Sequence, residues 1–202
     1  MWIGLVCLYG VLKGVRDIIK KKAMEKNSAM EVLFFYTFIS FLFVTPSVKN
    51  ALSIDFHYIG FVMIKSAIIF IAWICSFKAI KKLPIGFYGI MDMSRVIFAT
   101  VLGVTVLGEV MTGHKIAGMA LVLVGLLFVN AKGKGLGEEK TKPIYIVLVL
   151  ISCLCNAVSE LLDKMLMQSM NSGQLQFWYM FFMVILYLGY MIAVSYTHLT
   201  LP

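Results

Sequence analysis

The chain has 202 residues, of which 61% are hydrophobic and 14% are charged, and its formal net charge is +8. Water-soluble domains are about 45–50% apolar, so this composition excludes a soluble globular protein, and the closely spaced apolar runs leave no room for a separate soluble domain. The lysines cluster at the ends of apolar runs, which is typical of orientation in a membrane, and no nucleic-acid partner is expected.

Apolar runs of about 17–25 residues predict helices that cross a lipid bilayer. Seven stretches are assigned on this basis: residues 2–19, 32–48, 58–80, 85–107, 116–130, 144–162 and 175–194. The first begins without a basic leader or cleavage site, so we interpret it as a retained span. The predicted fold is an all-α, polytopic transmembrane helix bundle, a multi-pass protein of the inner or plasma membrane of the cell.

A linker and a faint repeat suggest how these spans are organised. Residues 132–143 are rich in Gly, Lys and Glu and predict a linker. The segment DIIKKKAMEKNSAMEVLFFYTF around the first span resembles SELLDKMLMQSMNSGQLQFWYMFF around the sixth. Residues 1–131 would then form a five-helix repeat and residues 144–194 would begin an inverted copy, three helices short of completion. Residues 195–202, SYTHLTLP, change in character and are expected to be a non-native tail.

Several spans carry charges near their middles. A charge at bilayer depth costs about 2.5–3.5 kcal/mol on insertion scales, so it should face a polar interior. In the first span, Lys13 and Asp17 are four residues apart and are expected to pair, beside Arg16. The alternative for Arg16 and Lys20 is that their long side chains snorkel to the interface. Lys65 is the lone mid-span charge of the third run and should face the interior.

The fourth and sixth spans carry the remaining candidates. Tyr88, Asp92 and Arg95 share one stripe of a helix, where Asp92 and Arg95 are spaced to pair and to bind a zwitterionic or charged solute. Alternatively, that pair only neutralises itself and orients the helix. Asn156 and Glu160 share a face of the sixth span, and Glu160 could carry a coupled proton or only hydrogen-bond between helices. The predicted substrate cavity therefore comprises Lys13, Arg16, Asp17, Lys65, Tyr88, Asp92, Arg95, Asn156 and Glu160.

One stretch carries a recognisable pattern. Residues 77–129 read FKAIKKLPIGFYGIMDMSRVIFATVLGVTVLGEVMTGHKIAGMALVLVGLLFV. A polar turn before Pro, a helix ending in Leu-Gly-Glu and a closing helix with Gly-x6-Gly resemble the EamA-like transporters of the drug/metabolite transporter superfamily. The matching positions, to which the resemblance gives structural roles, are Pro84, Gly108, Glu109, Gly118 and Gly125.

The resemblance implies ten helices in two inverted repeats around a central cavity, with this chain truncated at its C-terminal end. It also implies secondary, alternating-access transport of small metabolites, amino acids or drugs, in the export direction. The expected partners are a small-molecule substrate and the lipid bilayer, with proton coupling, and with a homodimer if seven spans are the whole protein. The alternative is a non-transporting membrane subunit or scaffold.

Enzymes, cofactors and metals are not expected. The chain contains no HExxH or GxSxG motif, no Asp-Asp pair at catalytic spacing and no cysteine pattern for zinc.

The orientation of the chain in the membrane is predicted in two conflicting ways. Eleven lysines follow odd-numbered spans and three follow even-numbered spans, which places the amino terminus outside the cell. The family resemblance implies that both termini are cytoplasmic.

Overall fold

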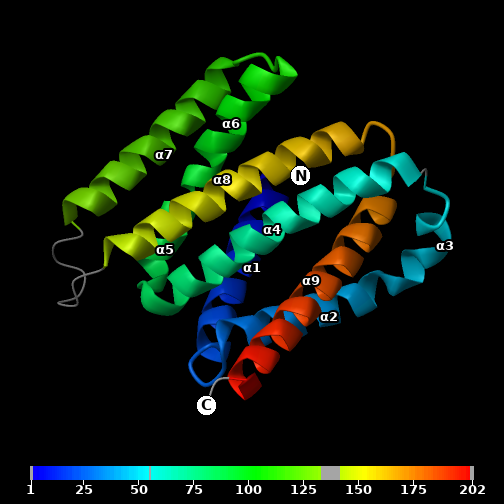
Figure 1. Ribbon diagram of the computed structural model, residues 1–202. Helices are drawn as coiled ribbons and strands as arrows, with labels where there is room; N and C mark the ends of the chain where they lie inside the picture. Colours follow the sequence, from blue (N-terminus) through cyan, green and yellow to red (C-terminus); the bar gives the residue numbers. More distant parts are fainter. Residues whose placement is uncertain (1, 55, 133–141, 201–202) are drawn as a thin grey trace.

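The computed structural model describes residues 2–54, 56–132 and 142–200, which form helices joined by short connections, with no strand among them (Figure 1). The helices are α1 Trp2–Ala23, α2 Ala29–Val44, α3 Val48–Ala51, α4 Phe56–Lys82, α5 Ile85–Asp92, α6 Ser94–Leu107, α7 Gly113–Lys132, α8 Pro143–Leu166 and α9 Ser172–Thr200, with a 3-10 turn, η1 Thr45–Ser47, between α2 and α3. The all-α prediction is confirmed.

The bundle is built for a membrane. Four of the described segments are long and apolar enough to cross a bilayer: Phe56–Lys82, Ile85–Leu107, Pro143–Leu166 and Ser172–Ala193. The apolar segments Ala29–Val44 and Gly113–Phe128 are shorter. Although α1 is long enough, every stretch of eighteen residues within it contains Lys13, Arg16 and Asp17. The prediction of a polytopic transmembrane bundle is confirmed, and α1 is its most charged long helix.

The helix ends differ from the predicted span ends in ways that matter for the site. Instead of ending at residue 19, α1 continues to Ala23, and α8 continues four residues past position 162 to Leu166. Both helices have lysines in their last turn, and the positive charge of these side chains interacts favourably with the negative end of the helix dipole. The predicted second span does not run to residue 48 as one α-helix, because η1 interrupts it at Pro46.

The predicted division into a repeat at 1–131, a linker at 132–143 and a second copy at 144–194 stays a prediction, and most of the linker lies outside the described residues. The backbone of α9 is helical to Thr200, through most of the segment predicted to be a non-native tail. Side chains from Val194 onward lie outside the described residues.

Several hydroxyl side chains inside the helices form hydrogen bonds within their own helix. The hydroxyls of Thr37 and Ser66 donate to the carbonyl oxygens four residues earlier, at 2.8 Å in both cases. At the start of α2, the Ser28 hydroxyl and the Glu31 carboxylate each accept a backbone N–H in a capping box. In a bilayer an unsatisfied polar group costs several kcal/mol, so these bonds are what permit Ser and Thr at such depths.

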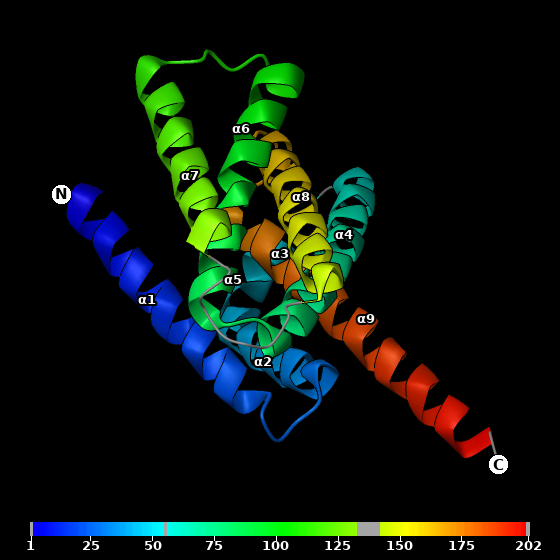
Figure 2. The same cartoon turned by 90° about the vertical axis from the view of Figure 1, so that its left-hand side faces the viewer.

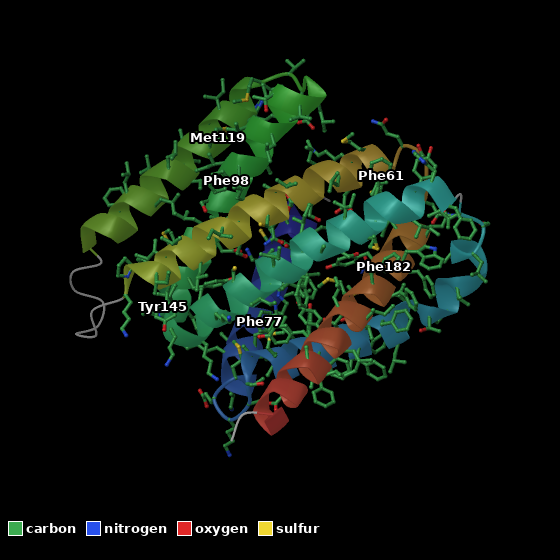
Figure 3. The ribbon with its side chains drawn as sticks, viewed as in Figure 1. Phe61, Phe77, Phe98, Met119, Tyr145 and Phe182 are labelled. Atoms are coloured by element: carbon green, nitrogen blue, oxygen red, sulfur yellow. The ribbon has the colours of Figure 1, made fainter. Side chains whose placement is uncertain are left out.

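The centre of the bundle is the contact between α4 and α8, which run side by side (Figure 1), while α9 packs on α2 and α4. Fully buried side chains such as Phe77, Met183 and Tyr187 fill the space between these helices, and Phe77 is labelled near the end of α4 in Figure 3. The rings of Phe70 and Tyr187 lie 4.8 Å apart across α4 and α9. Lipid is as apolar as this core, so close packing and polar contacts hold the helices together.

Two parts project from this centre. The α6–α7 hairpin extends to one end of the molecule, and α1 lies to one side, with its amino-terminal half away from the other helices (Figure 2). Leu5, Val6 and Leu8 on that half are 56%, 63% and 55% exposed, as befits a surface that faces lipid. Lysines of α1 contact the rest of the bundle: Lys13 pairs with Asp92, and Lys21 donates to the carbonyl of Leu83.

Candidate functional site

A cavity of about 270 Å³ lies in the polar centre of the bundle. We call it the chamber. Eight of the nine predicted cavity residues, which come from α1, α4, α5, α6 and α8, line it: Arg16, Asp17, Lys65, Tyr88, Asp92, Arg95, Asn156 and Glu160. The ninth predicted residue, Lys13, does not line the chamber, but its ammonium contacts Asp92 in the chamber wall. Residues from five helices, far apart in the sequence, thus meet in one place.

Four ion pairs surround the chamber. They are Lys13 Nζ with Asp92 Oδ2 at 2.7 Å, Arg16 Nε with Asp17 Oδ1 at 3.3 Å, Lys65 Nζ with Asp163 Oδ1 at 2.8 Å, and Arg95 Nε with Glu160 Oε1 at 3.2 Å. The first joins α1 to α5, the third joins α4 to α8 and the fourth joins α6 to α8. Each acid of the chamber therefore has a basic partner, and three of the four pairs bind different helices together.

Two predicted pairings are wrong. Asp92 and Arg95 do not pair along one helix, because the helix is interrupted at Met93 and each side chain meets a residue from another helix. Lys13 pairs with Asp92 rather than with Asp17, because Arg16 occupies the Asp17 carboxylate. In both cases a tertiary contact replaces a local one.

The interruption at Met93 lies directly beside the chamber. The N–H of Met93 donates to the carbonyls of Ile90 and Met91, so the regular α-helical hydrogen bonding is broken between α5 and α6. The Cys153 thiol of α8 approaches the Asp92 carbonyl at 3.6 Å and the Asp92 carboxylate at 3.9 Å. Broken helices at bilayer depth are tolerated where they line a polar cavity, which is the situation of Asp92.

Lys65 faces the interior, as predicted for a lone charge in a long apolar run. It is 5% exposed, and its ammonium lies 4.0 Å from the centre of the Tyr179 ring of α9. Its 2.8 Å contact with Asp163 Oδ1 lacks hydrogen-bond alignment, so the attraction is electrostatic. The aromatic face and the carboxylate together compensate the buried charge.

Sequence reasoning missed part of the chamber. The predicted cavity omits Asp163, although this residue lies on the same helix face as Asn156 and Glu160; α8 includes it, and its side chain lines the chamber. Lys20 was assigned to snorkelling, whereas it lines the chamber. Ser76 was also missed, and its hydroxyl lies 2.6 Å from that of Tyr88. The shared face with Asn156 and Glu160 could have indicated Asp163, and the continuation of α1 to Ala23 could have indicated Lys20.

The residues matching the family pattern lie at helix ends and on α7. Pro84 precedes the first residue of α5, and Gly108 ends α6 with φ +65, a left-handed conformation that glycine adopts without strain. Glu109 Oε2 lies 2.9 Å from Lys115 Nζ, and Glu109 Oε1 lies 2.5 Å from Lys164 Nζ of α8. Gly118 and Gly125 have open space where a Cβ would stand, so no described neighbour requires them to be glycine.

Comparison with protein-family models matches residues 1–131 to the EamA-like transporter family. The chain belongs to this family. No curated protein and no solved structure matches it. EamA-like proteins are membrane transporters of the drug/metabolite type, which agrees with a multi-pass bundle that carries its charges in its centre. The described residues of this EamA-like chain hold no group of three or more His, Cys, Asp or Glu side chains arranged around a metal position.

Proposed function

We propose that this protein is a secondary transporter that carries a small zwitterionic or charged solute through the chamber by alternating access. The observation that carries the proposal is the convergence of four ion pairs on one cavity between apolar helices. Charges at this depth are costly, and those that persist there commonly mark a solute or ion pathway.

The Arg95–Glu160 pair is the proposed first contact for the solute. Its side chains are 28% and 44% exposed, against 19% and 10% for Lys13 and Asp92. A solute with a carboxylate and an ammonium can replace each partner with its own opposite charge, so neither Arg95 nor Glu160 would be left unpaired. Asn156, on the same face of α8 as Glu160, would orient the solute through hydrogen bonds.

The proposal also covers proton coupling, the direction of transport and the membrane in which the protein acts. Glu160 is the most exposed acid of the four pairs, which supports it as the group that takes up and releases a coupled proton. Export across the inner or plasma membrane is proposed from the family resemblance. A homodimer is part of the same proposal.

One observation favours a second function. Every acid around the chamber already has a basic partner, which is also the arrangement expected of a subunit or scaffold whose charges only join helices. The two functions differ in flux, because a scaffold moves no solute.

The test is uptake of a radiolabelled amino-acid mixture into liposomes that contain the purified chain. Replacing Asp92→Asn and Arg95→Gln together should lower flux at least tenfold, since both a helix contact and a solute contact are lost. The matched control is Lys115→Gln, which removes an exposed pair outside the chamber and should leave flux unchanged. Wild-type liposomes that take up no more label than empty ones would favour the scaffold, whereas flux that the double variant retains in full would overturn the chamber as the route of the solute.

A further inference from the structure

A second hollow shares a wall with the chamber. A groove of about 910 Å³ lies between α1, α2 and the distal part of α9, and we call it the α1–α2 groove. Its lining is mainly apolar: Leu12, Val15, Ile19, Ala23, Val32, Phe35 and Met191. Arg16, Lys20 and Tyr36 line both the groove and the chamber. An apolar surface open to the bilayer therefore leads directly to the edge of a polar cavity.

Lys20 is the charge at this shared wall that lacks an acid. The four acids of the chamber are taken by Lys13, Arg16, Lys65 and Arg95, and within the described part of the chain no carboxylate lies within ion-pair distance of Lys20. Its ammonium stands instead 5.0 Å from the centre of the Tyr36 ring and 4.8 Å from that of Phe77. The wall between groove and chamber thus carries one surplus positive charge.

Neighbouring groups leave this charge open to an anion. Arg16 contacts Asp17 through Nε, and the rest of its guanidinium fork has further N–H donors. Glu31 also lines the groove, but its carboxylate accepts the Ser28 N–H at 2.8 Å in the capping box. An anion between Lys20 and Arg16 would gain charge-assisted hydrogen bonds from both.

We propose that the α1–α2 groove binds an amphiphile with one alkyl chain and an anionic head, such as a long-chain carboxylate, with its head on Lys20 and Arg16. Lys20 lies three residues before the end of α1, or about 5 Å, so the head sits near the membrane surface. Leu12 lies eight residues deeper, or about 12 Å, so the tail follows α1 and α2 into the bilayer. The charge complements the head and the apolar lining complements the tail.

This inference goes beyond the proposed transport function, because it adds a binding site for amphiphilic anions beside the chamber and does not make them the transported solute. Solute transport rests on the proposed function, but binding in the groove does not.

The test is photolabelling of the full chain in phosphatidylcholine nanodiscs with a long-chain carboxylate that bears a diazirine on its alkyl chain. We expect labelled peptides from the groove, competition by unlabelled long-chain carboxylate, and at least tenfold weaker competition by the alcohol of equal length. Equal competition by the alcohol would overturn the role of the anion. Stronger competition by phosphatidylglycerol than by the single-chain carboxylate would overturn the single-chain occupant in favour of a two-chain lipid.

Matched variants make the assignment residue-specific. Lys20→Gln should weaken labelling about tenfold, the worth of one charged hydrogen bond, while Lys20→Arg should retain it. Lys22→Gln, at an exposed lysine two residues away, should not change it. If Lys20→Gln does not fold, Val15→Trp fills the groove from a side chain that is 48% exposed and should abolish labelling. Unchanged labelling in either variant would overturn the proposal. The assay requires no flux, so a failure of the transport proposal would not alter its outcome.

Discussion

The ammonium of Lys13 lies 2.7 Å from the carboxylate of Asp92, and this contact joins residues 79 positions apart in the chain. It anchors α1 to α5 in a region where α1 otherwise offers lipid-facing side chains. Both side chains are largely buried, at 19% and 10% exposure. A buried pair of this kind contributes little in net terms when intact, but removing one partner leaves an uncompensated charge.

We therefore predict that Asp92→Asn lowers the free energy of unfolding by about 3 kcal/mol, because the Lys13 charge is left without its partner. Lys13→Met combined with Asp92→Leu should recover most of this loss, since neither charge remains. The measurement is a double-mutant cycle on denaturation in detergent. Additive losses in the double variant would contradict a direct coupling between the two residues.

The Arg95–Glu160 pair should behave in the opposite way. Its side chains are 28% and 44% exposed, so Arg95→Gln should change stability by less than about 1 kcal/mol. Flux should nevertheless fall at least tenfold if this pair contacts the solute. Measuring the melting temperature and the liposome flux of the same preparation separates the two effects. A large loss of stability with flux intact would make the pair purely structural.

The stability of the protein should depend on pH through Glu109, which lies in the connection between α6 and α7. Hydrogen bonds from Lys164 and Lys115 lower the pKa of Glu109 from its ordinary 4.5 to about 2. The folded state therefore binds this proton less tightly than the unfolded state. The stabilisation is fully present above about pH 4.5, declines as the pH falls from there and disappears below about pH 2.

The corresponding measurement compares wild type with Glu109→Gln. The wild type should be the more stable at about pH 7, and the difference should shrink as the pH is lowered toward about 3. Lys164→Gln should reduce the difference at neutral pH, because it removes the largest cause of the shift. A stability difference that does not vary over this range would show that the lysines do not stabilise the Glu109 carboxylate.

Gly103 on α6 should be intolerant of a side chain for a reason specific to Glu109. A Cβ at Gly103 would stand 3.1 Å from Glu109 Oε2, and that carboxylate is held in place by Lys115 and Lys164. Gly103→Ala should therefore displace the carboxylate and lower the melting temperature. Gly125→Ala is the control, because open space surrounds that position and alanine favours the helix by about 1 kcal/mol. Equal effects of the two substitutions would contradict this contact.

Much of the chamber could be inferred from apolar run length and charge. Lys65, Asp92 and Glu160 stand in runs too apolar for them to face lipid, so an inward orientation follows from the cost of a charge in hydrocarbon. The interruption at Met93 could not be inferred, because no proline or glycine occupies that position. The Cys153 thiol that lies near the Asp92 carbonyl belongs to α8, which is distant in the sequence. The pairing of Asp163 with Lys65 likewise depended on the packing of α8 against α4.

The order of residues along the chain was enough to predict a bundle of membrane helices with an ionised centre, because hydrophobic length and the penalty for lipid-facing charge are properties of each segment alone. The choice of partner for each charge needed the folded chain. Lys13 could reach Asp17 within its own helix, yet it meets Asp92, because the packing of α1 against α5 brings that carboxylate closer while Arg16 takes the local one. Such competition between local and distant partners depends on three-dimensional proximity, which residue spacing does not encode.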